Sequence, residues 1–180
     1  MVISLIRFAL VAPVGDAGTE PTPPIGLAYL AGMCKKANVE VIGIDAAGRN
    51  LNKTFKIPKY NLKGNGLEVD EIIKLIDPRT KTIGISSMFS HEWPYVRDSI
   101  NQIKNKFPAA KIVVGGEHVT AIPEYCLRDC NSIDYISLGE GEETWSEIIK
   151  KNDNNFDEIA GLAYLKNNKF IPSEPRKRIR

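Results

Sequence analysis

The sequence has little that would mark a membrane-bound, secreted or nucleic-acid-binding protein. It contains no run of about 18 apolar residues that could cross a bilayer. The apolar N-terminus is interrupted by Arg7 and has no clear cleavage site after it, so it predicts a first strand rather than a signal peptide. The net charge is only +2, and three cysteines in 180 residues cannot form a disulfide framework. We therefore expect a cytoplasmic protein with no nucleic-acid or membrane partner.

Motifs of several common α/β enzymes are also missing or incomplete. The stretch from Gly139 begins like a GxGxxG dinucleotide motif, but Thr144 stands where the third glycine belongs. The sequence has no P-loop lysine and no serine or cysteine on a G-x-S-x-G elbow. The strand that ends at Ser86 lacks the aspartate of a response regulator. These absences argue against dinucleotide, P-loop, serine-hydrolase and phosphorelay chemistry.

What the sequence does contain is a regular alternation of apolar strands and amphipathic helices. One helix opens near Thr22, which can cap it, and buries one stripe with spacing i, i+3, i+4, i+7 at Leu27, Leu30, Ala31 and Cys34. The alternation predicts an α/β fold, flavodoxin-like or Rossmann-like, with a five-stranded parallel sheet in the order 2-1-3-4-5 and helices on both faces. The predicted strands cover residues 4–11, 39–45, 82–86, 112–114 and 133–138.

Two segments fall outside this alternation. Residues 46–65 have no clear periodicity and predict a long connection, which in a compact domain is functional or mobile. Residues 161–171 predict a C-terminal β-hairpin that turns at Asn167 and Asn168.

Small residues follow four of the predicted strands at the carboxyl edge of the sheet, where ligands bind in open α/β folds. Four such loops together predict a wide, shallow platform for a large flat ligand or a long nucleotide tail. For the Gly-Gly pair at 115–116, a tight turn and a close approach by a ligand are both open readings. The four loops are residues 13–18, 86–88, 115–118 and 139–141.

The histidines and paired cysteines each have two interpretations. His118 is a candidate ligand or base, or a polar support for the glycine loop, and nearby Thr120 can cap a following helix. His91 could approach a ligand or simply begin a helix beside Glu92. Cys126 and Cys130 share one helix face at i, i+4, and we favour two buried apolar side chains over a metal site there. We predict no metal site and no catalytic residue in this chain.

Six segments together resemble the N-terminal cobalamin-binding domain of cobalamin-dependent radical S-adenosylmethionine enzymes. The most specific combination is GGEHVT followed by GEGEE. The segments are PPIGLAYLAG (23–32), VIGIDA (41–46), IGISSM (83–88), VVGGEHVTAIPE (113–124), IDYISLGEGEETW (133–145) and IAGLAYLKNNKFI (159–171).

The resemblance implies a cobalamin-binding module, most often part of a methyltransferase. The DxHxxG motif is absent after the first strand, which reads APVGDAG, so the resemblance implies base-off cobalamin without a protein histidine on cobalt. A CxxxCxxC motif is absent too, so S-adenosylmethionine and a 4Fe-4S cluster are expected only in a C-terminal region beyond residue 180. It further implies a binding domain over 1–152 and a linker hairpin over 153–180 leading to a radical SAM barrel in cis. The implied cobalamin-binding residues are Pro13, Gly15, Asp45, Ser86, Ser87, Met88, Gly115, Gly116, His118, Gly139, Glu140 and Gly141.

Two other functions remain open from the residues alone. A small α/β enzyme could act on a nucleotide or phosphate ester at the same edge if its carboxylates converge. Alternatively, a protein-interaction domain would have no crevice at all. The carboxylates in question are Asp16, Asp45, Glu117 and Glu140.

Overall fold

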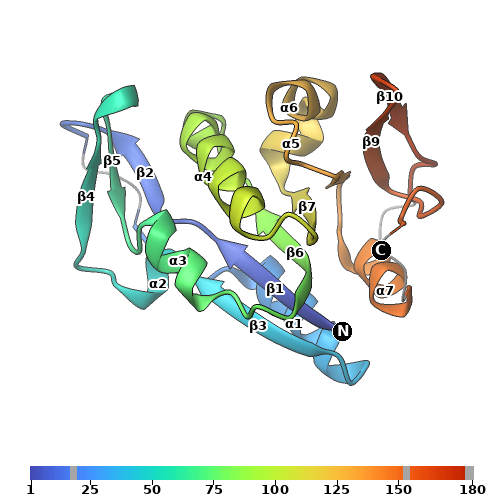
Figure 1. The fold of residues 1–180 in the computed structure, drawn as a ribbon. Helices are drawn as coiled ribbons and strands as arrows, with labels where there is room; N and C mark the ends of the chain where they lie inside the picture. The colour runs from blue at the N-terminus through green and yellow to red at the C-terminus, as the bar shows by residue number, and fades with distance from the viewer. Residues whose placement is uncertain (17–19, 152–154, 177–180) are drawn as a thin grey trace.

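Five parallel strands form the centre of the main sheet in the computed structural model, which describes residues 1–16, 20–151 and 155–176. Their order across the sheet is β3-β1-β6-β7-β8, with parallel pairing throughout. This is the predicted 2-1-3-4-5 order, and it confirms the flavodoxin-like class (Figure 1). The strands are β1 (Val2–Arg7), β3 (Glu40–Asp45), β6 (Thr80–Ser86), β7 (Lys111–Gly115) and β8 (Tyr135–Ser137).

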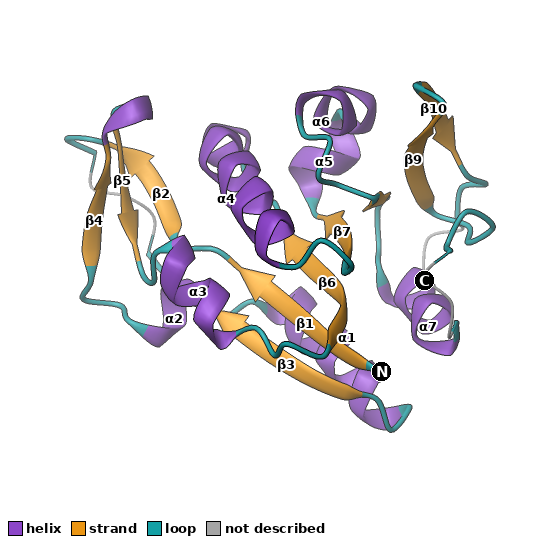
Figure 2. Ribbon diagram, in the orientation of Figure 1, coloured by secondary structure: helices purple, strands orange, loops and turns teal. Residues whose placement is uncertain are grey.

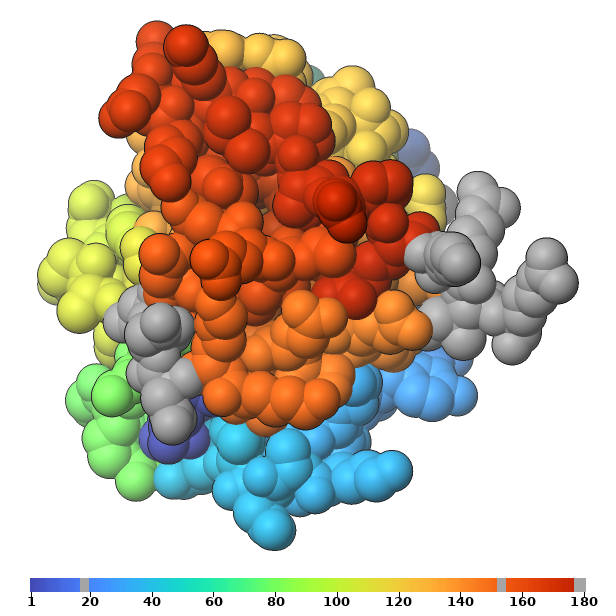
Figure 3. Space-filling view, turned by 90° about the vertical axis from the view of Figure 1, so that its right-hand side faces the viewer, coloured from blue at the N-terminus to red at the C-terminus, as the bar shows by residue number. Residues whose placement is uncertain are grey.

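The predicted C-terminal hairpin is present and extends the same sheet. Strand β9 (Leu162–Lys166) pairs antiparallel with β8, and β10 (Lys169–Pro172) pairs with β9. Asn167 and Asn168 make the turn with φ values of 49° and 61°, a left-handed conformation that asparagine tolerates well. In the side view, α7 and the hairpin β9–β10, drawn orange to red, cover much of one face of the molecule (Figure 3).

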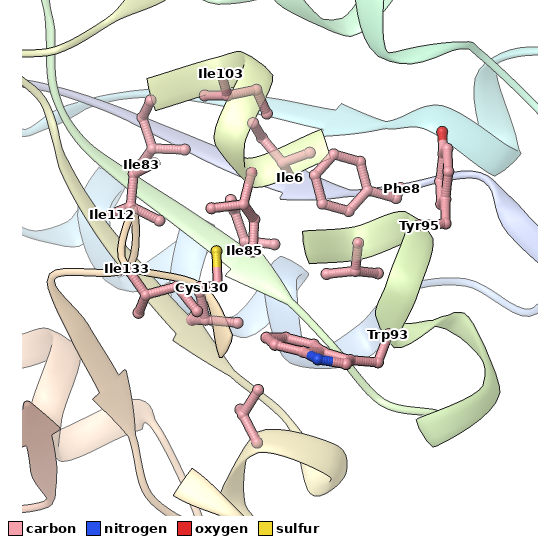
Figure 4. Packing of buried hydrophobic residues seen from close by; sticks show 14 of the residues in the cluster. Ile6, Phe8, Ile83, Ile85, Trp93, Tyr95, Ile103, Ile112, Cys130 and Ile133 are labelled. Atoms are coloured by element: carbon pink, nitrogen blue, oxygen red, sulfur yellow. The ribbon is translucent and has the colours of Figure 1, made fainter. Parts of the chain in front are cut away.

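Helices cover both faces of the sheet, as predicted (Figure 2). Helices α1 (Ile25–Lys36) and α7 (Glu142–Lys150) pack on one face with a buried cluster that includes Cys34, Val113 and Phe156. A larger cluster fills the opposite face, where Ile6, Ile83 and Ile103 lie between the strands and α4 (Figure 4). The helices on that side are α3 (Val69–Leu75), α4 (Trp93–Lys106), α5 (Glu117–Ala121) and α6 (Pro123–Asp129).

A small second sheet corrects two predictions. The predicted strand 4–11 is wrong, because the chain leaves the main sheet after Arg7 and begins β2 (Leu10–Pro13). The predicted loop 46–65 is also wrong, since it contains α2 (Ala46–Arg49), β4 (Thr54–Ile57), η1 (Pro58–Tyr60) and β5 (Leu62–Asn65). The antiparallel order is β2-β5-β4. The pairing of β5 with β2, which lies far away in the sequence, is not visible in any local pattern.

The start of α1 differs from the prediction as well. Pro24, not Thr22, is the N-cap residue, and no side chain caps the helix. The carbonyl of Thr22 instead accepts a hydrogen bond from the guanidinium of Arg7. Within the described ranges, no helix is long and apolar enough to span a bilayer.

Candidate functional site

A slot of about 230 Å³ opens where β6, β7 and β8 end against α1 and α7. Leu27 and Leu30 of α1 form one wall, and Trp145 of α7 forms another. Trp145 can lie against the sheet because β6 carries Gly84, where an added Cβ would stand 2.5 Å from the indole ring. The slot therefore has apolar walls, and it is bordered by main chain and by Glu117, Glu140 and Glu142.

Three of the four predicted loops meet at this slot. The fourth loop, which contains Pro13 and Gly15, lies at the end of the small sheet and does not line it. Met88, 44% exposed, lies at the mouth of the slot. The predicted residues that line the slot are Ser86, Met88, Gly115, Gly116, Gly139, Glu140 and Gly141.

The two adjacent glycines have different roles. Gly116 has φ of 116°, and an added Cβ would stand 2.3 Å from the carbonyl oxygen of Ser87. Gly115 has room, because an added Cβ would meet only Ser137 at 3.7 Å. Gly116 is therefore required by the backbone, whereas Gly115 leaves part of the slot open.

Hydrogen bonds tie the loops of the slot to one another. The amide of Ser87 donates to the carbonyl of Gly115 at 2.8 Å. The hydroxyl of Thr120 accepts a hydrogen bond from the amide of Gly139 at 3.1 Å. Thr120 thus joins the loop after β8 to α5 and does not cap a following helix as predicted, since α6 begins at Pro123. The slot is a connected backbone structure rather than three independent loops.

Sequence reasoning missed Ser137, which ends β8 and lines the slot. Ser137 is 2% exposed, and its hydroxyl has no hydrogen-bond partner among the described residues. Burying an unpaired hydroxyl is costly, so an atom of this kind in a cavity wall suits a polar group on a ligand. A small polar residue at the end of the last parallel strand was the available signal.

His118 and the helix cysteines lie on the opposite side of the sheet from the slot. Nδ1 of His118 is 2.9 Å from the hydroxyl of Ser90, and Nε2 is 3.6 Å from Sγ of Cys126. The imidazole also packs on Trp93 with ring centroids 5.1 Å apart. Burial raises the pKa of Cys126 to about 12 and that of Cys130 to about 11. Both cysteines are buried, protonated side chains, as we favoured over a metal site. His118 bonds Ser90, in the turn after β6, on the side of the sheet away from the slot.

The carboxylates needed by the alternative enzyme do not gather in one place. Asp45 accepts a hydrogen bond from Nε of Arg7 at 2.8 Å and another from the amide of Gly48 at 3.0 Å. It therefore caps α2 and forms an ion pair with Arg7 of β1. Glu117 and Glu140 line the slot. Over residues 1–16, 20–151 and 155–176, no three His, Cys, Asp or Glu side chains could together hold a metal ion.

A family model described as the B12-binding domain matches residues 13–149, which is most of the chain. The chain belongs to the B12-binding domain family. The slot fits the tail of that cofactor, because its apolar walls suit a benzimidazole and its bare glycine edges and the Ser137 hydroxyl can bind polar groups. The slot is also at the edge of the sheet where the sequence placed the ligand.

Two curated relatives are named as methyltransferases. An uncharacterised methyltransferase of Pyrococcus horikoshii is 32% identical over 98% of this chain and 34% of its own length. The cytidylyl-2-hydroxyethylphosphonate methyltransferase of Streptomyces wedmorensis is 31% identical over 79% of this chain and 27% of its own. The chain thus spans about a third of the first relative and about a quarter of the second.

Among solved structures, the chain is similar to the N-terminal domain of a hypothetical protein of Thermotoga maritima. The two share 24% sequence identity with a TM-score of 0.45, and the match covers 71% of this chain and 83% of the other.

Proposed function

We propose that this chain binds cobalamin in the base-off form, with its nucleotide tail in the slot between β6–β8 and helices α1 and α7. The observation that carries the proposal is the slot itself, an apolar cavity with an unpartnered buried hydroxyl and a rim of glycines. Leu27, Leu30 and Trp145 would hold the benzimidazole. The Ser137 hydroxyl, beside the open space at Gly115, would face a polar group of the ligand.

Both histidines have contacts with other residues of the chain. The chain has two, and His118 is buried among Ser90, Trp93 and Cys126. Nε2 of His91 donates to the carbonyl of Val11 at 2.9 Å, and its ring stacks on Phe89. These contacts support binding without a protein histidine on the metal.

We further propose that the chain is the N-terminal module of a radical SAM methyltransferase in the cytoplasm. Support comes from two longer relatives named as methyltransferases and from the resemblance of its motifs to that family. When bound, cobalamin supplies a cobalt that can carry a methyl group. S-adenosylmethionine and the 4Fe-4S cluster belong to the barrel proposed to follow in cis. The buried, unpaired thiols suit a reducing compartment.

Retention of hydroxocobalamin through desalting tests binding. The wild-type protein should elute coloured, and Gly115→Val should elute colourless because a valine side chain would project into the slot. Gly43→Val is the matched control, since this exposed strand glycine also has open space around an added Cβ. A colourless wild-type protein would overturn the proposal, provided that urea unfolding shows it folded.

The absorption spectrum tests the lower ligand. The bound cofactor should show a base-off spectrum that is identical in wild type and in His91→Ala. A spectrum that shifts in His91→Ala would contradict the absence of a histidine ligand, while leaving cobalamin binding itself intact.

A further inference from the structure

A second cavity of about 290 Å³ lies beside the slot. It opens between the ends of β1 and β6, where the strand order of the parallel sheet reverses and ligands of such sheets characteristically bind. The two cavities share Gly26, Leu27, Ser86 and Met88 in their walls. A ligand whose tail fills the slot would therefore pass over Ser86 and Met88 and meet the second cavity next.

The wall of this second cavity holds a fixed carboxyl group, that of Glu92. Oε1 of Glu92 accepts a hydrogen bond from the amide of Val11 at 3.3 Å. The neighbouring His91 bonds the carbonyl of the same Val11 at 2.9 Å. The turn η2 (Ser90–Glu92) is thus bonded to both polar groups of one residue in β2, which holds Glu92 in place. Burial raises the pKa of Glu92, although Val11, His91 and Arg7 act in the opposite direction.

The second cavity has two other charged residues, Arg7 and Glu20, and neither is held in its wall as Glu92 is. The guanidinium of Arg7 is already engaged by Asp45 at 2.7 Å and by the carbonyl of Thr22. Glu20 is exposed at the rim. Glu92 therefore sets the chemistry of the wall. An ionised carboxylate accepts hydrogen bonds through about four lone-pair sites, so after the bond from Val11 it favours a neutral N–H donor and repels an anion.

We propose that Glu92 accepts a hydrogen bond from a carboxamide side chain on the rim of the corrin ring, which enters this second cavity. The inference rests on the proposed function and names a contact within it. The nucleotide tail then occupies the slot, and an uncharged amide donor of the ring lies at Glu92.

Binding of hydroxocobalamin and of dicyanocobinamide, which keeps the ring amides but lacks the nucleotide tail, tests the inference. Glu92→Gln should weaken both ligands by the same factor, about tenfold, because the charge-assisted hydrogen bond is lost. Gly115→Val should weaken only hydroxocobalamin. Glu124→Gln, which removes an exposed carboxylate on α6, should change neither. Urea unfolding of each variant confirms that it is folded.

Cobalamin monocarboxylic acids, in which one propionamide is hydrolysed, supply the sharper readout. At pH 8, wild type should bind at least one of these isomers about tenfold more weakly than hydroxocobalamin, and Glu92→Gln should remove that penalty for the same isomer. Equal penalties in both proteins, or an unchanged affinity of Glu92→Gln for cobinamide, would overturn the inference while cobalamin binding stands. Failure of wild type to bind any corrinoid would overturn the proposed function and this inference together.

Discussion

At the scale of single residues, Gly116 shows how a positive φ and a close backbone contact combine. Replacement by alanine should lower the free energy of unfolding by about 2–4 kcal/mol, because the left-handed backbone is strained and the new Cβ would overlap the Ser87 carbonyl. Gly43→Ala is the control, with ordinary φ and open space, and should change the free energy by less than about 1 kcal/mol. Urea denaturation measures both. Equal effects would mean that the Ser87 contact is not a constraint.

His118 should make the stability of the protein depend on pH. Burial lowers its pKa below the ordinary value of 6.5, so the unfolded chain takes up this proton at a higher pH than the folded protein does. The stabilisation from burying a neutral ring is thus complete above pH 6.5 and is lost as the pH falls toward the folded pKa. The free energy of unfolding should decline just below pH 6.5 in wild type.

Substitution separates His118 from other groups that titrate in acid. His118→Gln should flatten the decline just below pH 6.5, whereas His91→Gln should retain it. Urea midpoints measured over this pH range give the slopes. A His118→Gln protein with the wild-type slope would show that another group is responsible.

The sequence predicted several of the residues that line the slot and missed others, and both outcomes have a physical reason. Glycines at strand ends bear on backbone conformation, which is local, so Gly115 and Gly139 could be placed from their neighbours alone. Ser137 looks like an ordinary strand residue, and its importance depends on its hydroxyl being buried without a partner among the described residues. The contacts of His118 with Ser90 and Cys126 also depend on packing between separate elements.

At the scale of elements, strand order followed from the alternation of strands and helices, but the small sheet did not. Strand β5 has Gly64 facing Phe55 of β4, where an added Cβ would stand 2.2 Å from the phenyl ring. A strand of this kind has little β-propensity of its own. Its stability comes from partners that are far away in the sequence, such as β2, and a local reading therefore assigns it to a loop.

The buried residues just before and within the hairpin β9–β10 bear on where the binding domain ends. The predicted boundary at residue 152 lies outside the described residues and stays a prediction. Phe156, Ile159 and Leu162 are each at most 1% exposed and belong to the core shared with α7. Exposing buried side chains of this size costs about 2–5 kcal/mol each, which approaches the total stability of a typical domain.

A chain that ends at residue 151 should therefore lose cooperative unfolding, as followed by circular dichroism in urea. A chain that ends at Arg176 is the control and should unfold like the full chain, because it keeps the bonds of Arg176 to Thr144 and Glu147. A cooperative 1–151 fragment of unchanged stability would support the boundary at 152 and show that the hairpin is an accessory.

At the scale of the whole molecule, the slot is lined by elements that lie far apart in the sequence. Its walls run from Gly26 in α1 to Trp145 in α7, so a bound ligand should be linked to global unfolding rather than to one loop. Hydroxocobalamin at about 100 times its Kd should raise the free energy of unfolding by about 2.7 kcal/mol. The urea midpoint of Gly115→Val should not respond. A wild-type midpoint that is also unchanged would indicate that the cofactor does not bind the folded state selectively.

The bond between Thr120 and the Gly139 amide belongs to a rim made largely of peptide groups. Almost every residue carries the same peptide group. The positions of glycines, where no side chain covers the main chain, therefore determine such a rim more than the identity of the side chains around it. A substitution next to the rim can therefore leave its peptide groups in place, whereas a side chain added at one of the glycines changes the rim itself.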